Sequence, residues 1–173
     1  FITRTLYYLK QQMDEGKITY DDILRKYMQE LHANEIVLLS YYIAAINIEA
    51  VFDKVNGPDR GYKPFEGIVL TDTFESTELQ GTLDDDMFGV NNRRLKKQQE
   101  VPITAIISNP PYSKRQNSES ENNQNIHYSH LEKQISDTYI KLSKSNAKNS
   151  LLDSYIKAFR WASDRIGEQG VIG

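Results

Sequence analysis

The sequence predicts a doubly wound α/β fold, in which helices cover both faces of a parallel sheet. Short strand-like runs end at Glu35, Asp72 and Asn109. Between them lie segments whose apolar residues recur three and four positions apart, which is the spacing of a helix. Strands that alternate with helices indicate βαβ units, and 173 residues are enough for one domain with its own core.

The expected elements follow one another in a regular order. They are helices at about 2–13 and 22–30, a strand ending near 35, a helix at 37–55, strands at 67–71 and 103–108, helices at 131–143 and 151–166, and a strand beginning at 170. The helix at 37–55 carries on one broad face Leu38, Tyr41, Tyr42, Ala45, Ile48 and Phe52. The helix at 151–166 carries at core-facing spacing Leu152, Tyr155, Ile156, Phe159 and Ala162.

The tetrapeptide Asn109-Pro110-Pro111-Tyr112 is the most informative feature of the chain. Its prolines stiffen the loop and remove two backbone donors. An exocyclic amino group has two donors, which the Asn109 side-chain oxygen and the Pro110 carbonyl can accept, while Tyr112 offers a face for stacking. The motif therefore indicates methylation of an amino group on a base. The alternative is a simple strand terminator, because Asn-Pro and Pro-Pro are common turn signals.

On this tetrapeptide and the acid-bearing strand ends upstream of it, the chain resembles the S-adenosylmethionine-dependent N6-adenine DNA methyltransferases of restriction-modification enzymes. The resemblance implies a Rossmann-like methyltransferase sheet over residues 1–173, truncated at both ends. It implies that Asn109 and the Pro110 carbonyl hold N6 of a flipped adenine, with Pro111 stiffening the loop and Tyr112 stacked on the ring. It also implies S-adenosyl-L-methionine as cofactor, DNA as partner, and nuclease or helicase domains in the same enzyme.

Glu35 is the candidate for binding the ribose of the cofactor. It ends a strand that opens onto a helix, and a carboxylate at this point of a doubly wound fold binds ribose hydroxyls. The alternative is a solvated glutamate that the helix dipole favours.

Two further cofactor contacts follow from the resemblance. It implies that Asp72 accepts a hydrogen bond from the amino group of the cofactor's adenine, and that Phe74 covers the adenine ring. The alternatives are a capping or turn aspartate, since Asp is a favoured N-cap, and a core aromatic.

The resembling enzymes carry a Gly-rich turn before a helix that begins much like residues 1–6, and no glycine precedes Gly16 here. Backbone approaches the cofactor closely at such a turn, so these 173 residues alone are expected to bind it weakly. In that family the first strand lies between those ending at Glu35 and Asn109. Its absence is expected to leave a gap in the sheet, and an open edge favours self-association.

Basic residues closely follow the tetrapeptide. Lys114 and Arg115 are the candidates for contacts with DNA phosphates, whereas the cluster at 93–97 is more simply a solvated surface. The segment 113–129 is rich in Ser, Asn and Gln, so we expect it to be mobile when unbound. It either closes over DNA or is a tolerated surface insertion.

The composition favours a cytoplasmic protein. The absence of cysteine excludes disulfides and thiolate metal sites, and the histidines show no ligand spacing, so no metal is expected. The longest apolar run is well short of the ~18 residues that a membrane span needs. The net charge of −3 is not that of a stand-alone DNA-binding domain.

Other functions stay open at this level. One is an inactive Rossmann-like interaction module, which would bind no cofactor. Another is amino methylation of RNA or protein, because the same tetrapeptide chemistry serves any planar amide or amine. The identity of the methylated product distinguishes that activity from methylation of DNA.

Overall fold

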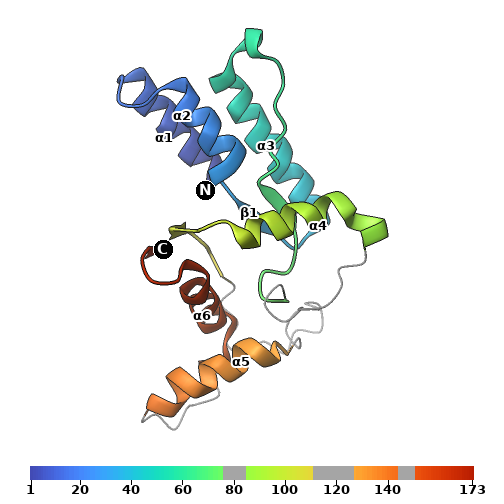
Figure 1. The fold of residues 1–173 in the computed structure, drawn as a ribbon, viewed down its shortest axis with the longest axis vertical. Coiled ribbons are helices and arrows are strands. Elements are labelled where there is room, and N and C mark those ends of the chain that lie inside the picture. Colours follow the sequence, from blue (N-terminus) through green and yellow to red (C-terminus); the bar gives the residue numbers. More distant parts are fainter. Residues whose placement is uncertain (76–84, 111–126, 144–150) are drawn as a thin grey trace. The chain divides into compact units, whose positions relative to one another are not determined.

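A computed structural model describes the chain at residues 1–75, 85–110, 127–143 and 151–173, with the backbone alone at 85–88 (Figure 1). The chain divides into two compact units. The first comprises residues 1–73 and 82–101, and the second comprises 74–81 and 102–173.

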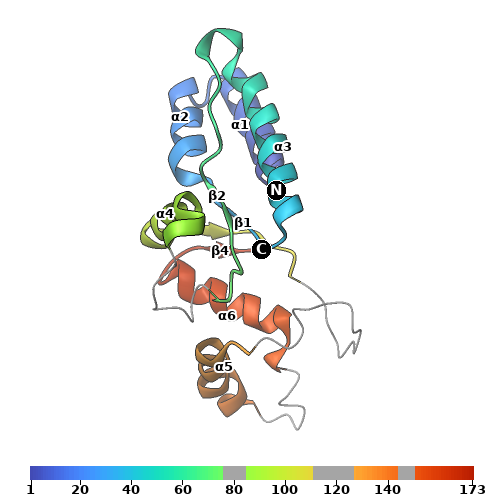
Figure 2. The same ribbon diagram turned by 90° about the vertical axis from the view of Figure 1, so that its right-hand side faces the viewer.

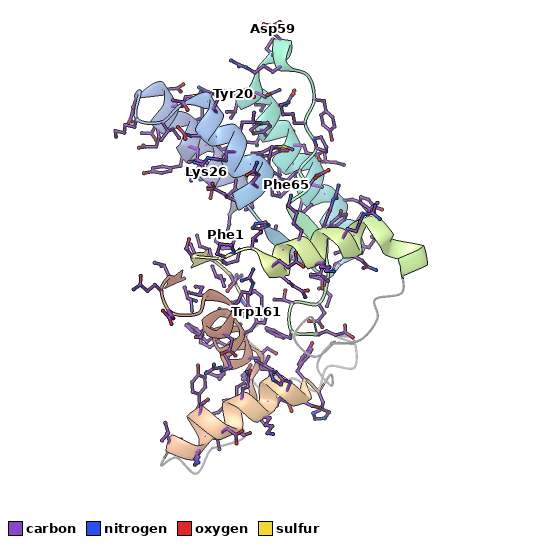
Figure 3. The ribbon with its side chains drawn as sticks, in the orientation of Figure 1. Phe1, Tyr20, Lys26, Asp59, Phe65 and Trp161 are labelled. Carbon is purple, nitrogen blue, oxygen red and sulfur yellow. The ribbon has the colours of Figure 1, made fainter. Side chains whose placement is uncertain are left out.

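Helices form one layer of the first unit. They are α1 (Ile2–Asp14), α2 (Tyr20–Arg25) with its π-helical continuation η1 (Lys26–Glu30), and α3 (Leu38–Asn56), which a 3-10 turn, η2 (Pro58–Arg60), follows. Figures 1 and 2 show α1 and α3 side by side, and Figure 3 marks Asp59 at the tip of the turn after α3. A capping box starts α2, because the side chains of Thr19 and Asp22 each accept from the other's backbone N–H.

The core of the first unit lies between these helices. Its buried members are Leu6, Ile23, Tyr27, Ile48, Phe52, Val55, Phe65 and Ile68. The rings of Tyr27 and Phe52 stack with 3.6 Å between centroids and 6° between planes. Phe65, labelled in Figure 3, lies 5.2 Å from the Tyr27 ring. Aromatic rings therefore join η1, α3 and the segment before β2.

A parallel pair of strands completes the first unit. Strand β1 (Ala33–Glu35) lies alongside β2 (Ile68–Leu70), with Glu35 opposite Leu70. Ile68 and Val69 are both buried, and because successive side chains alternate in direction, both faces of β2 are covered. Ile68 joins the helical core, and α4 (Asp85–Glu100) packs against β2 (Figure 2). The sequence β1–α3–β2 is a parallel βαβ unit, which confirms the α/β class.

The second unit contains another parallel pair, β3 (Ala105–Ile106) and β4 (Val171–Ile172). Its helices are α5 (Ser129–Ile135), which continues as the π-helix η4 (Ser136–Ile140), and α6 (Ser154–Ile166). Tyr128, Leu131 and Ile135 are buried between them, and Trp161 of α6 packs against this cluster (Figure 3).

Three features of these helices were not anticipated from the sequence. Helix α4 was not predicted. On α3, Ile48 and Phe52 are buried, but Leu38 and Tyr42 are 52% and 56% exposed, because α3 is apolar on more than one side.

The third correction concerns α6. Tyr155 and Phe159 were expected in the core, but they are 38% and 40% exposed. They contact each other edge to face, with 5.0 Å between ring centroids.

No helix in the described part of the chain is long and apolar enough to cross a membrane.

Candidate functional site

Glu35 lies at the end of β1, directly before α3. Its Oε1 accepts a hydrogen bond from the backbone N–H of Val37 at 2.9 Å, and Val37 is the N-cap residue of α3. The carboxylate is thus held near the positive end of the helix dipole. No residue that the structure describes donates to Oε2, so this oxygen is available to a hydroxyl group.

Asp72 follows the neighbouring strand, β2. The two strands are parallel, and the N–H of Thr71 donates to the carbonyl of Glu35 at 2.9 Å. Nδ2 of Asn34 donates to Oγ1 of Thr73 at 3.3 Å, which joins the end of β1 to the segment after β2. The structure therefore brings Glu35 and Asp72 to adjacent strand ends at one edge of this pair.

Asn109 follows β3 in the second unit. Pairing with β4 continues beyond β3, since the N–H of Ser108 donates to the carbonyl of Gly173 at 2.9 Å. The strand delivers Asn109 at its carboxyl end, as the sequence predicts, and Asn109 is exposed while Pro110 is half-buried. The remaining predicted site residues lie outside the described part of the chain; they are Pro111, Tyr112, Lys114 and Arg115. Most of the segment 113–129 lies outside it as well.

Phe74 belongs to the second unit. Its ring meets that of Tyr128 edge to face, with 5.3 Å between centroids. It is one of the partly buried side chains around Leu131 and Ile135. These contacts explain an aromatic residue at position 74 as part of the core, and its contact with a cofactor stays a prediction.

An ion pair lies beside the same aromatic cluster. Nζ of Lys157 donates to Oε1 of Glu132 at 2.6 Å and lies 5.1 Å from the centroid of the Tyr128 ring. Burial raises the pKa of Glu132, but the hydrogen bond and charge of Lys157, together with His127, outweigh it and hold that pKa below its ordinary value. The ionised carboxylate therefore ties α5 to α6.

The sequence did not single out Asn91 of α4. Its Oδ1 accepts from the N–H of Leu70 at 2.8 Å, and its Nδ2 donates to the carbonyl of Leu70 at 2.9 Å. Asn91 stands in a polar stretch without apolar periodicity. The one indication of an inward position is its place one helical turn before the buried Leu95.

The chemistry at the ends of β1 and β2 is that of hydrogen-bond acceptors. Ionised carboxylates accept from hydroxyl and amino groups, the polar groups that ribose and adenine present. Within the described residues, no group of three or more His, Cys, Asp or Glu side chains could hold a metal ion. These acceptors suit the hydroxyl and amino donors of a nucleoside.

Three solved structures are similar to nearly the whole chain. One is a nuclease-deletion mutant of the Type ISP restriction-modification enzyme LlaGI in complex with a DNA substrate mimic, with 66% identity over 99% of this chain and a TM-score of 0.93. Another is the ATP-dependent Type ISP restriction-modification enzyme LlaBIII bound to DNA, with 61% identity over 99% and a TM-score of 0.92. The DrdV–DNA complex, from cryo-EM, shows 36% identity over 99% and a TM-score of 0.81.

The matched regions are small parts of these proteins. The chain spans 14% of the LlaGI chain, 12% of the LlaBIII chain and 15% of the DrdV chain. Neither a protein-family model nor a curated protein matches it. The chain is therefore homologous to one segment of Type ISP restriction-modification enzymes.

Proposed function

We propose that this chain is part of the Rossmann-like methyltransferase domain of a restriction-modification enzyme and transfers a methyl group to N6 of adenine in DNA. The observation that carries the proposal is the position of Asn109 at the carboxyl end of β3, followed in the sequence by Pro-Pro-Tyr. The similarity to LlaGI and LlaBIII supports a restriction-modification enzyme with DNA as substrate.

The acids of the first unit would hold the cofactor. S-adenosyl-L-methionine, when bound, supplies an electrophilic methyl group. Oε2 of Glu35 accepts from the ribose hydroxyls, because Oε1 is engaged by Val37. Asp72, at the neighbouring strand end, accepts from the adenine amino group of the cofactor. Carboxylates after adjacent parallel strands suit such a ligand, since nucleotides bind at the carboxyl ends of strands in open α/β sheets.

Asn109 and the residues after it act on the substrate base. The Asn109 side-chain oxygen and the Pro110 carbonyl accept the two hydrogens of adenine N6, which shifts electron density onto that nitrogen. Neither Pro110 nor Pro111 has a backbone N–H, so the loop presents acceptors at these positions without competing backbone donors. Tyr112 stacks on the flipped base, a contact worth about 1–3 kcal/mol in single-strand binders, and so offsets part of the cost of base flipping.

The test uses the full-length protein that carries this sequence. It is incubated with DNA and methyl-labelled S-adenosyl-L-methionine, and the DNA is then digested to nucleosides. We expect labelled N6-methyladenine, reduced at least about 100-fold in Asn109→Ala, the scale of losing one hydrogen bond to the reacting group. The matched control is Asn47→Ala, which removes an exposed asparagine from α3 and should leave the yield unchanged.

Two other results would contradict the proposal. Methylated RNA or protein in place of methylated DNA would reassign the substrate. No binding of S-adenosyl-L-homocysteine by the full-length protein would favour an inactive interaction module.

A further inference from the structure

The side chain of Asn91 closes the outer edge of β2. In this parallel ladder Val69 and Thr71 direct their backbone groups toward β1, as the bond from the Thr71 N–H to the Glu35 carbonyl shows. The N–H and carbonyl of Leu70 therefore point away from β1. Asn91 binds both, accepting at 2.8 Å and donating at 2.9 Å. Its amide thus stands in for the backbone of a neighbouring strand.

An asparagine suits this position because its amide has one donor and one acceptor side by side. Leu70 is half-buried, so loss of the amide would leave two partly buried backbone groups without a partner. Aspartate at this position could accept from the Leu70 N–H, but its second oxygen would face the Leu70 carbonyl, and two acceptors repel each other. Leucine or alanine would satisfy neither group.

The bonds of Asn91 fix the strand two residues before Asp72. On the other edge of β2, the Thr71 N–H donates to the backbone carbonyl of Glu35 at 2.9 Å. Nδ2 of Asn34 donates to Oγ1 of Thr73 at 3.3 Å. The segment that carries Asp72 is therefore held from β1 and, through Asn91, from α4. A shift of Leu70 toward α4 or away from it would move the Asp72 carboxylate with it.

We propose that Asn91 is a positioning residue for recognition of the cofactor's adenine, and that it acts through Asp72. The inference rests on the proposed function, because it takes Asp72 as the acceptor for the adenine amino group. It adds a residue of α4 that the sequence did not mark. Asn91 itself touches the Leu70 backbone and need not touch the cofactor.

The experiment measures ligand binding to the full-length protein by calorimetry, with two probes. S-adenosyl-L-homocysteine carries the adenine amino group, and S-inosyl-L-homocysteine has an oxygen in its place. We expect Asn91→Ala to weaken binding of the first by about threefold to tenfold, the scale of one net hydrogen bond, and to leave binding of the second unchanged. Unchanged binding of the inosyl probe also shows that the variant is folded.

A double-mutant cycle with Asp72→Ala supplies the decisive comparison. If Asn91 acts through Asp72, Asn91→Ala should cause no further loss in the Asp72→Ala background. Additive losses, or an equal loss for both probes, would overturn the inference and make Asn91 a general structural residue. Should alanine unfold the unit, Asn91→Asp keeps the acceptor for the Leu70 N–H, and the same discrimination between probes is expected.

Failure of the proposed function gives a different result. If the protein without substitutions does not bind S-adenosyl-L-homocysteine, or if Asp72→Ala binds it unchanged, the role of Asp72 is wrong and the inference falls with it. Both results appear without any change at Asn91. The control is Asn47→Ala, an exposed asparagine of α3, which should bind both probes like the unsubstituted protein.

Discussion

The backbone N–H of Val37 donates to Oε1 of Glu35, two residues earlier, at 2.9 Å. This bond places one carboxylate oxygen at the start of α3 and leaves the other without a donor among the described residues. Oε1 of Glu35 therefore caps the first turn of α3, whereas Oε2 can accept from a ligand. A substitution that changes only one of them can test this division.

Glu35→Gln is that substitution. The Val37 N–H selects the amide oxygen, so α3 should start as before, while an amide nitrogen replaces Oε2 and cannot accept from a ribose hydroxyl. We expect binding of S-adenosyl-L-homocysteine to weaken by about 1.5–3 kcal/mol, the usual loss for a hydrogen bond to a charged group. Calorimetry on the full-length protein measures this. Asp53→Asn, which removes an exposed carboxylate from the same helix, is the control, and an equal loss there would contradict the assignment.

The placement of Glu35 and Asp72 at neighbouring strand ends could be predicted from the sequence, because parallel strands that alternate with helices end at the same edge of a sheet. Helix α4 could not. It buries Leu95 and half-buries Asn91, while Arg93 and Lys96 are exposed, so no apolar stripe marks it as a helix. Its contact with β2, made in part through a polar side chain, contributes stability that the sequence pattern does not reveal.

Helix α3 shows the opposite difficulty. Its spacing identifies a helix, but it is apolar on two sides: Ile48 and Phe52 are buried, while Leu39 and Ile46 are 68% and 63% exposed. Periodicity cannot choose between two apolar faces. Packing against α1 decides which face enters the core, and that contact lies outside any local pattern.

The stacked rings of Tyr27 and Phe52 should dominate the stability of the first unit. Phe52→Ala would leave a cavity under the Tyr27 ring and is expected to lower the free energy of unfolding by about 3–5 kcal/mol. Tyr27→Phe keeps the stack but loses the hydroxyl bond to the Lys63 carbonyl, at 3.1 Å, and should cost about 1 kcal/mol. Amide hydrogen exchange in α1 and α3 of the full-length protein measures both.

The control for the hydroxyl is Tyr8→Phe. Tyr8 is 59% exposed, so loss of its hydroxyl should change the free energy of unfolding by less than about 0.5 kcal/mol. Equal effects of Tyr27→Phe and Tyr8→Phe would show that the bond to Lys63 contributes nothing.

The Lys157–Glu132 pair should stabilise the helix pair α5–α6 in the second unit. Lys157→Met leaves the Glu132 carboxylate without its closest donor and is expected to destabilise these helices by about 1–3 kcal/mol. Replacing both residues, with Glu132→Leu added, should recover much of this loss because no charge is then left unpaired. Hydrogen exchange of α5 and α6 reports the change, with Lys133→Met at an exposed position as control. A double variant as unstable as the single one would contradict this account.

The same pair predicts how stability depends on pH. The pKa of Glu132 is lower in the folded protein than its ordinary value of 4.5, so the folded carboxylate binds a proton less readily than the unfolded one. Its stabilisation is complete above about pH 4.5 and is lost as the pH falls through the lower folded pKa. In Glu132→Gln we expect this loss to disappear from the exchange protection of α5 and α6. An unchanged pH dependence in that variant would assign the effect to other groups.

Lys114 and Arg115 should set part of the salt dependence of DNA binding. They follow Asn109 by five and six residues, so even a fully extended chain keeps Lys114 within about 18 Å of it, close enough for phosphates beside a base held there. The affinity for DNA falls with salt, and each lost phosphate contact makes the slope of log affinity against log salt shallower by about 0.9. We expect the double variant Lys114→Gln/Arg115→Gln to reduce that slope by up to about 1.8, measured by fluorescence anisotropy with the full-length protein.

The matched comparison is Lys96→Gln/Lys97→Gln on the exposed side of α4, which removes the same charge from a surface that the sequence predicts to be solvated. This variant should keep the slope of the unsubstituted protein. Because phosphate contacts carry no sequence information, the loss at 114 and 115 should be similar for all DNA sequences. A reduced slope in the α4 variant with an unchanged slope in the loop variant would move the phosphate contact to α4, whereas a loss confined to one DNA sequence would point to contacts with the bases instead.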